Sequence, residues 1–80
     1  MNKFDIDGKK IEEDQNNYLK ETFDLPEFTG DYEDIYFYLV GFYTKTIVNI
    51  TNPDKIDPLL IDAFQRASDE NDLVSVNIEE

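Results

Sequence analysis

The chain has 80 residues, and its 19 acidic residues outnumber its 7 basic ones, which gives a formal net charge of -12 at pH 7. This acidity argues against direct binding to nucleic acid or to anionic lipid headgroups, and no stretch has the roughly 20 apolar residues that cross a bilayer. A hydrophobic content of 40% is typical of one folded domain, residues 1–80, and not of a disordered acidic tail. Because cysteine is absent and residues 1–5 hold no secretion signal, we expect a cytoplasmic protein.

The start of the chain predicts a strand followed by a helix. Residues 4–7 alternate apolar and acidic side chains before Gly8, which is typical of a short strand, although Asp7-Gly8 also fits a tight hairpin. We favour a helix over residues 12–23, because the acids at positions 12–14 would complement the dipole of its first turn. The side chains expected on its buried side are Ile11, Leu19 and Phe23, with Tyr18 partly covered.

A second helix is predicted from Asp31 to about Val40. Leu25-Pro26 ends the first helix, Gly30 supplies a turn, Asp31 caps the second helix, and Gly41 stops it. The residues at helical spacing that should face the core are Tyr32, Ile35, Tyr36 and Leu39. The side chains expected on the other side, toward solvent, are Asp34, Phe37 and Tyr38.

The second half of the chain predicts a strand, a helix and a strand. The β-branched run at residues 46–50 is typical of a strand, and residues 51–54 follow as a loop. Asp57-Pro58 marks the start of a helix, which is expected to fray at Asn71-Asp72. Residues 73–78 alternate as a last strand. The inward side chains of the helix and of this strand are expected to be Leu60, Ile61, Phe64, Ala67, Val74, Val76 and Ile78.

The predicted order is strand, helix, helix, strand, helix, strand. Helical crossovers between strands are typical of parallel pairing. The sequence therefore predicts an α/β fold, in which about three helices pack on a small three-stranded, mainly parallel sheet. No internal repeat or linker interrupts it.

Acidic residues are densest at residues 21–34, which hold six carboxylates and no base. A focused negative field attracts cationic partners, so this segment indicates binding of a basic protein. A solvated surface that favours solubility is the alternative explanation. Without histidine, cysteine or a Gly-rich phosphate loop, we expect no enzyme activity, no cofactor and no metal site.

Residues 25–41, with Pro26, Phe28, Gly30 and Asp34, resemble the barstar family of intracellular inhibitors of the bacterial ribonuclease barnase. Residues 4–11 are similar to the opening strand and turn of that family, and residues 64–78 to its last helix and strand. The resemblance implies a barstar-like fold and an inhibitor that blocks the active site of a basic ribonuclease or a related toxic nuclease. The partner-binding residues that it implies, with the acids beside them, are Phe28, Thr29, Gly30, Asp31, Glu33, Asp34, Phe37 and Tyr38.

Within this surface each residue type has an expected role. Asp34, helped by Asp31 and Glu33, would pair with lysine or arginine of the partner. Thr29 and Gly30 would offer hydrogen bonds. The aromatic side chains expected to supply contact area are Phe28, Phe37 and Tyr38.

Three features differ from the family. Tyr38 and Arg66 stand where the family has acids, and the connection at residues 51–56 is short and leaves out a small helix. Two other functions therefore stay open: a regulatory interaction module with a basic non-nuclease partner, and a phosphate-mimicking decoy for a nucleic-acid-binding protein. We expect a monomer, and a weak homodimer through the aromatic face is the alternative.

Overall fold

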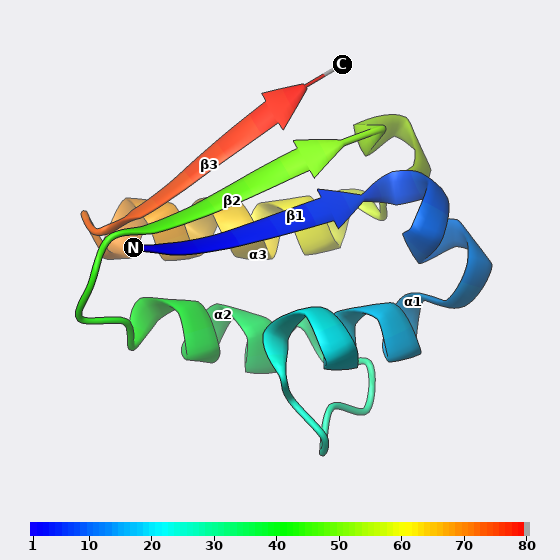
Figure 1. Cartoon of the computed structure of the whole chain (residues 1–80), viewed down its shortest axis with the longest axis horizontal. Helices are drawn as coiled ribbons and strands as arrows, with labels where there is room; N and C mark the ends of the chain where they lie inside the picture. Colours follow the sequence, from blue (N-terminus) through cyan, green and yellow to red (C-terminus); the bar gives the residue numbers. More distant parts are fainter. Residues whose placement is uncertain (80) are drawn as a thin grey trace.

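Residues 1–79 are described by a computed structural model in which three strands form one sheet and three α-helices pack against it (Figure 1). Along the chain the elements are β1 (Asn2–Asp7), α1 (Gly8–Phe23), α2 (Tyr32–Val40), β2 (Thr46–Thr51), the 3-10 helix η1 (Pro53–Lys55), α3 (Pro58–Glu70) and β3 (Val74–Glu79). The strands pair in the order β1-β2-β3, and both pairs are parallel. The predicted α/β fold is confirmed, and the sheet of these residues is parallel throughout.

The helices cover one face of the sheet and leave the other face to solvent. On the covered face Ile6 and Ile50 lie opposite each other and are 1% and 0% exposed. On the open face Asp5, Asn49 and Asn77 form one row across the three strands. The Asn49 amide donates to the Asp5 carboxylate at 3.3 Å, and the Asn77 amide donates to the Asn49 side-chain oxygen at 3.1 Å. Because parallel sheets are usually covered on both faces, polar side chains on this face are what lets it meet water.

The first helix starts earlier than the sequence predicts, directly after β1. The predicted start at residue 12 and the alternative hairpin at Asp7-Gly8 are both wrong. Asp7 is the N-cap, because its side chain accepts from the backbone N–H two residues later at 3.0 Å. A kink at Asp14, with φ -160° and ψ 83°, divides the helix. The Asp14 side chain accepts from the backbone N–H of Asn17 at 3.4 Å, so it caps the segment after the kink.

Gly8 marks a close approach between α1 and the connection after β2. A Cβ atom at Gly8 would lie 2.0 Å from the carbonyl oxygen of Asn52. Asn52 has a positive φ of 50°, and its side-chain amide donates to the Asp7 carboxylate at 3.0 Å. The helix therefore starts where the chain has a residue without a side chain.

The hydrophobic core lies between the sheet and the helices. The predicted buried side of α1 is confirmed, with Ile11, Leu19 and Phe23 buried and Tyr18 half-buried. The Tyr18 hydroxyl donates to the carbonyl of Asp5 at 2.9 Å and accepts from the N–H of Asp7 at 3.0 Å, which joins α1 to β1. The predicted inner side of α3 is also covered: Leu60, Phe64 and Ala67 are buried and Ile61 is half-buried.

The two ends of α3 are both fixed by side chains. Asp57 caps the start as predicted, accepting from the N–H of Leu59 at 2.9 Å. The predicted fraying at Asn71 is wrong, because its side-chain amide donates to the carbonyls of Val40 and Phe42 at 3.1 Å each. These two hydrogen bonds hold the end of α3 against the end of α2.

The side chains on the inward face of β3 become more exposed along the strand. Val74 is 2% exposed, whereas Ile78 is 39% exposed, so the predicted inward face is fully covered only at its start. The connection between β2 and α3 holds one 3-10 turn, Pro53–Lys55, where the sequence predicts only a loop. Among residues 1–79, none of the helices has the length and apolar character that crossing a membrane requires.

Replacing Gly8 by alanine is expected to destabilise the fold by about 2 kcal/mol, because the new Cβ would overlap the backbone of Asn52. Gly41→Ala is the matched control, since its Cβ would make only ordinary contacts of 3.6 Å and longer. Urea unfolding of the two variants measures the difference. Equal midpoints would show that the approach at Gly8 relaxes without cost.

The pH dependence of stability should carry a contribution from Asp7. Its pKa lies below the usual value, mainly because the carboxylate accepts the Lys9 backbone N–H and then because the Asn52 amide donates to it. A lowered folded-state pKa stabilises the fold above the unfolded pKa, and this contribution is lost as the pH falls through the folded value. We expect Asp7→Asn to be less stable than wild type at pH 7, and this difference to shrink as the pH falls through the lowered pKa of Asp7 in the fold. Thermal unfolding at pH 7 and at successively lower pH tests this, and a difference that stays constant would contradict it.

Candidate functional site

The loop before α2 is built from short-range hydrogen bonds. Asp24, at φ 53°, ends α1, and the N–H of Leu25 then donates to the carbonyl of Lys20 at 2.9 Å. Gly30 has a φ of 103°, which confirms the predicted turn that glycine makes easily. Asp31 caps α2 as predicted, accepting from the N–H two residues later at 3.0 Å. Gly41 follows as the C-cap.

The predicted contact residues differ in how far they reach solvent. The exposed residues are Thr29, Asp31, Asp34 and Phe37. The half-buried residues are Gly30, Glu33 and Tyr38, and only Phe28 is buried. All of them except Phe28 therefore have some accessible surface. They come from one segment, so their grouping follows directly from the turn at Gly30 and from α2.

Phe28 is part of the core, so its ring has little accessible surface for the contact area expected of it. Its side chain is only 3% exposed and belongs to the main hydrophobic cluster. The backbone turn from Leu25 to Phe28, closed by a 3.1 Å hydrogen bond, directs the ring inward. Phe28 also lines a surface pocket of about 360 Å³, whose other lining residues are Leu25, Pro26, Glu27 and Asp34.

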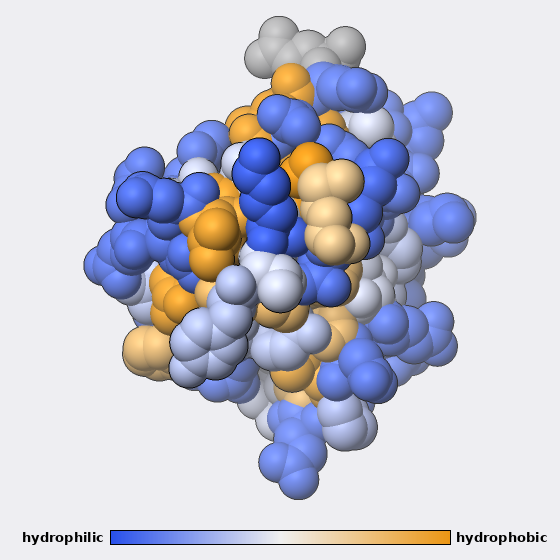
Figure 2. Space-filling view, turned by 60° about the vertical axis from the view of Figure 1, so that its left-hand side comes forward, coloured by the Kyte–Doolittle hydropathy of each residue, from blue (hydrophilic) through white to orange (hydrophobic). Residues whose placement is uncertain are grey.

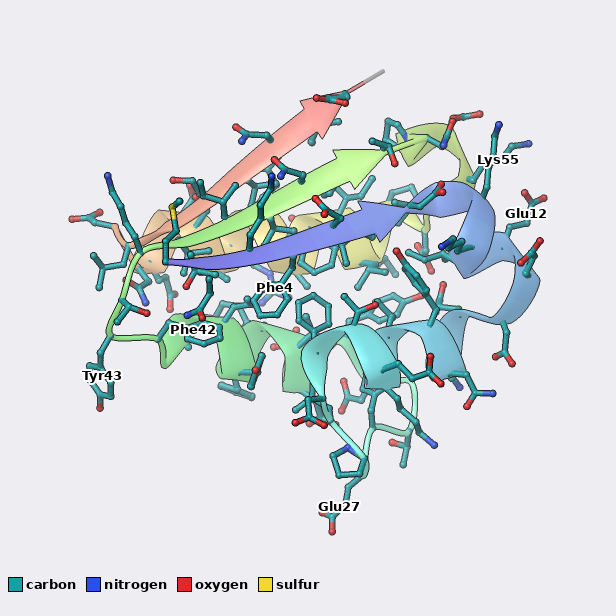
Figure 3. All side chains as sticks on the ribbon, in the orientation of Figure 1. Phe4, Glu12, Glu27, Phe42, Tyr43 and Lys55 are labelled. Atoms are coloured by element: carbon teal, nitrogen blue, oxygen red, sulfur yellow. The ribbon has the colours of Figure 1, made fainter. Side chains whose placement is uncertain are left out.

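Tyr38 does not lie on an open outer face either. Its ring centroid is 5.1 Å from that of Phe42, 6.1 Å from that of Phe23 and 6.5 Å from that of Phe4. Phe4 and Phe42 point toward each other between the sheet and α2 (Figure 3). Tyr38 thus covers the edge of an aromatic cluster that joins β1 to α2.

The tyrosines that were expected to face the core are only half-buried. The Tyr32 hydroxyl donates to the Asp57 carboxylate and accepts from the Gln15 amide, at 3.0 Å each. Burial is the main cause that raises the pKa of Tyr32. The Tyr36 hydroxyl donates to Glu70, and this hydrogen bond raises the pKa of Tyr36. Both rings cover the core while their hydroxyl groups connect neighbouring helices.

Arg66 pairs with two acids of its own chain. Its Nη2 lies 2.6 Å from the Glu33 carboxylate and its Nε lies 3.1 Å from Asp62, while the guanidinium carbon lies 4.8 Å from the ring centroid of Tyr36. Hydrogen bonding to Glu33 is the main cause that raises the pKa of Arg66. The spacing of Asp62 and Arg66 by four residues is the sequence signal for one of these pairs.

The Asp34 side of α2 carries negative charge that no ion pair compensates within residues 1–79. Within residues 1–79, Glu33 is the only carboxylate of the acidic segment 21–34 that forms an ion pair. Asp34 and Glu27 both line the pocket of the loop, and Glu27 lies at the tip of the loop (Figure 3). One turn along α2, Phe37 is 64% exposed. The arrangement combines unpaired carboxylates with apolar surface, which suits a lysine or arginine side chain.

Hydrophobic side chains also reach the surface on the face that Figure 2 shows. Large apolar or aromatic side chains that are exposed just before the three strands are Met1, Tyr43 and Leu73, with exposures of 81%, 94% and 37%. Tyr43 points away from the fold in Figure 3. These residues are outside the predicted contact surface, and the sequence reasoning does not single them out.

The described residues, 1–79, contain no cluster of three or more His, Cys, Asp and Glu side chains that could hold a metal ion. Comparison of the chain with protein-family models, with curated proteins and with solved structures found no match. The function is therefore argued from the residues of the loop and of α2.

Truncating the two phenylalanines of this segment should separate core from surface. Phe28→Ala is expected to lower the free energy of unfolding by about 3 kcal/mol, because it leaves a cavity in the core. Phe37→Ala is the control and should change stability by less than about 0.5 kcal/mol, because its ring is mostly exposed. Denaturant unfolding of both variants measures this. A change of less than about 1 kcal/mol in the free energy of unfolding of Phe28→Ala would mean that the ring is not essential to the core.

Proposed function

We propose that the protein is a cytoplasmic inhibitor that binds a basic ribonuclease, or a related toxic nuclease, and blocks its active site. This is the function that the resemblance of residues 25–41 to the barstar family implies. The observation that supports it best is the exposed Asp34 carboxylate, which has no ion-pair partner within residues 1–79 and lines an apolar-walled pocket. The α/β fold with a parallel sheet and three helices is compatible with that family.

The proposed mechanism is occupation of a cationic cleft by carboxylates in place of RNA phosphates. Asp34 sits in the first turn of α2, so the helix holds its position relative to the loop. The negative field of the chain would speed the encounter with a basic protein, and desolvated pairs at Asp34 would slow dissociation. The inhibitor acts by binding and catalyses no reaction itself.

Apolar contacts would complete the interface around Asp34. Phe37 offers the largest exposed ring of α2. Leu25 and Pro26 line the pocket beside Asp34, where the methylene stem of a lysine or arginine finds apolar surface. Thr29 and Gly30 lie next to them in the loop, where their polar groups can form hydrogen bonds to the partner.

A second candidate is a regulatory module that binds a basic protein other than a nuclease. One observation favours it: Arg66 already pairs with Glu33, so fewer acids are left for a cleft rich in arginine. Tyr38, half-buried among aromatic rings, supplies no charge. The two candidates share the Asp34 surface and differ in the partner.

Affinity capture from host lysate and secreted protein distinguishes them. Wild-type protein and the double variant Asp34→Ala, Phe37→Ala serve as bait, and each captured protein is assayed for RNA cleavage with and without added bait. The inhibitor proposal expects a basic ribonuclease that wild type silences and the double variant does not. Capture of a basic protein without nuclease activity would support the regulatory module.

Within the inhibitor proposal, Asp34→Ala should weaken binding to the captured nuclease by about 2 kcal/mol, or roughly 30-fold, because an interfacial cation loses its partner. Asp54→Ala removes the same charge from η1, outside the contact surface, and should change the affinity by less than about threefold. Calorimetric titration gives both constants. Equal losses would mean that only net charge matters.

A further inference from the structure

Arg66 occupies a position that a partner's cation would otherwise take. Its guanidinium is bound by the carboxylates of Glu33 and Asp62, at 2.6 and 3.1 Å, and lies 4.8 Å from the ring centroid of Tyr36. Two carboxylates and an aromatic face are also what an arginine from another protein would bind. The place beside Glu33 of α2 and Asp62 of α3 is therefore filled by a cation of the same chain.

This ion cluster is accessible to a partner. The side chains of Arg66, Glu33 and Asp62 are 41%, 47% and 60% exposed. They line a hollow of about 350 Å³, which is distinct from the Asp34 pocket and is also lined by Gly30 and Asp31. Leu59, which is 67% exposed, also lines this hollow. Because Glu33 directly precedes Asp34 in α2, a protein that covers both residues also meets Arg66 and this apolar side chain.

We propose that Arg66 determines the specificity of this surface by masking Glu33 and Asp62, so that it accepts partners with a cation at Asp34 and an uncharged side chain in the hollow beside Leu59. A second partner cation in the hollow would have to displace Arg66 or lie beside a like charge. This inference rests on the proposed function for its assumption that α2 faces a basic protein. Beyond that function, the inference specifies where the positive charges of the basic protein must lie.

A labelled hexa-arginine peptide is the probe, and binding is measured by fluorescence anisotropy at low salt. Arg66→Gln is compared with Lys55→Gln, which also removes one positive charge and lies with Glu12 at the opposite end of the molecule from Tyr43 (Figure 3). We expect Arg66→Gln to tighten binding at least about threefold more than Lys55→Gln, because it releases two carboxylates. Equal tightening would overturn the proposal, because net charge alone would then explain it.

A second measurement compares two backgrounds, and its wild-type arm, in which Arg66 stays in place, does not depend on how the Arg66→Gln variant folds. In the wild-type background, Glu33→Gln should leave peptide affinity unchanged within about 1.5-fold, while Asp34→Asn should weaken it about threefold. In the Arg66→Gln background, Glu33→Gln should weaken binding as much as Asp34→Asn. An equal loss from both substitutions in the wild-type background would show that Glu33 is not masked.

The two proposals can fail separately. The peptide assay contains no nuclease, so the masking of Glu33 is decided whether or not a ribonuclease is captured. If Glu33 is masked by Arg66 and no nuclease binds, the inhibitor proposal fails and the specificity proposal is retained. If a nuclease is inhibited, and if Glu33→Gln weakens peptide binding in the wild-type background as much as Asp34→Asn does, only the specificity proposal fails.

Discussion

Each of the three α-helices in residues 1–79 starts at an aspartate whose side chain accepts a backbone hydrogen bond, and the fold depends on these caps. The distances are 3.0 Å at Asp7, 3.0 Å at Asp31 and 2.9 Å at Asp57. Asp7 and Asp57 have further roles, because Asn52 donates to the first and Tyr32 to the second. The same side chains that start the helices therefore also join them to distant parts of the chain. In a chain with so much negative charge, these acids are used where positive helix ends stabilise them.

Caps and ion pairs use some carboxylates of the chain to stabilise the fold, and other carboxylates have no such role. Glu33 and Asp62 belong to the first group, because Arg66 links them across the packing of α2 on α3. Asp34 and Glu27 belong to the second, since within residues 1–79 neither forms an ion pair. Around the loop and the start of α2, the count of acids in the sequence thus overstates, by Glu33, the number of carboxylates without an ion pair in residues 1–79.

Much of the fold follows from the sequence because its signals are local. Strand alternation, the caps at Asp31 and Asp57 and the helical stripes predict the elements and most of the core. The start of α1 is missed although its signal, the cap at Asp7, is local. Other errors concern residues whose state is set by distant contacts, such as Asn71, which is held by carbonyls at the end of α2. Helical spacing predicts that Tyr38 faces solvent, and the resemblance places Phe28 in the contact surface, but neither reveals that Phe28 belongs to the core and that Tyr38 packs against it.

The position of Asp34 at the start of α2 has two opposing electrostatic effects. The N-terminal end of a helix carries partial positive charge, which stabilises Asp31, Glu33 and Asp34 despite their mutual repulsion. The same positive end weakens the field that these acids project into solvent. A partner at a distance therefore senses mainly the net charge of the chain, which is screened by salt over about 10 Å. Selectivity must arise at contact, where the unpaired Asp34, the exposed Phe37 and the paired Arg66 differ most from one another. On such a surface, the placement of the single cation matters more than the number of acids.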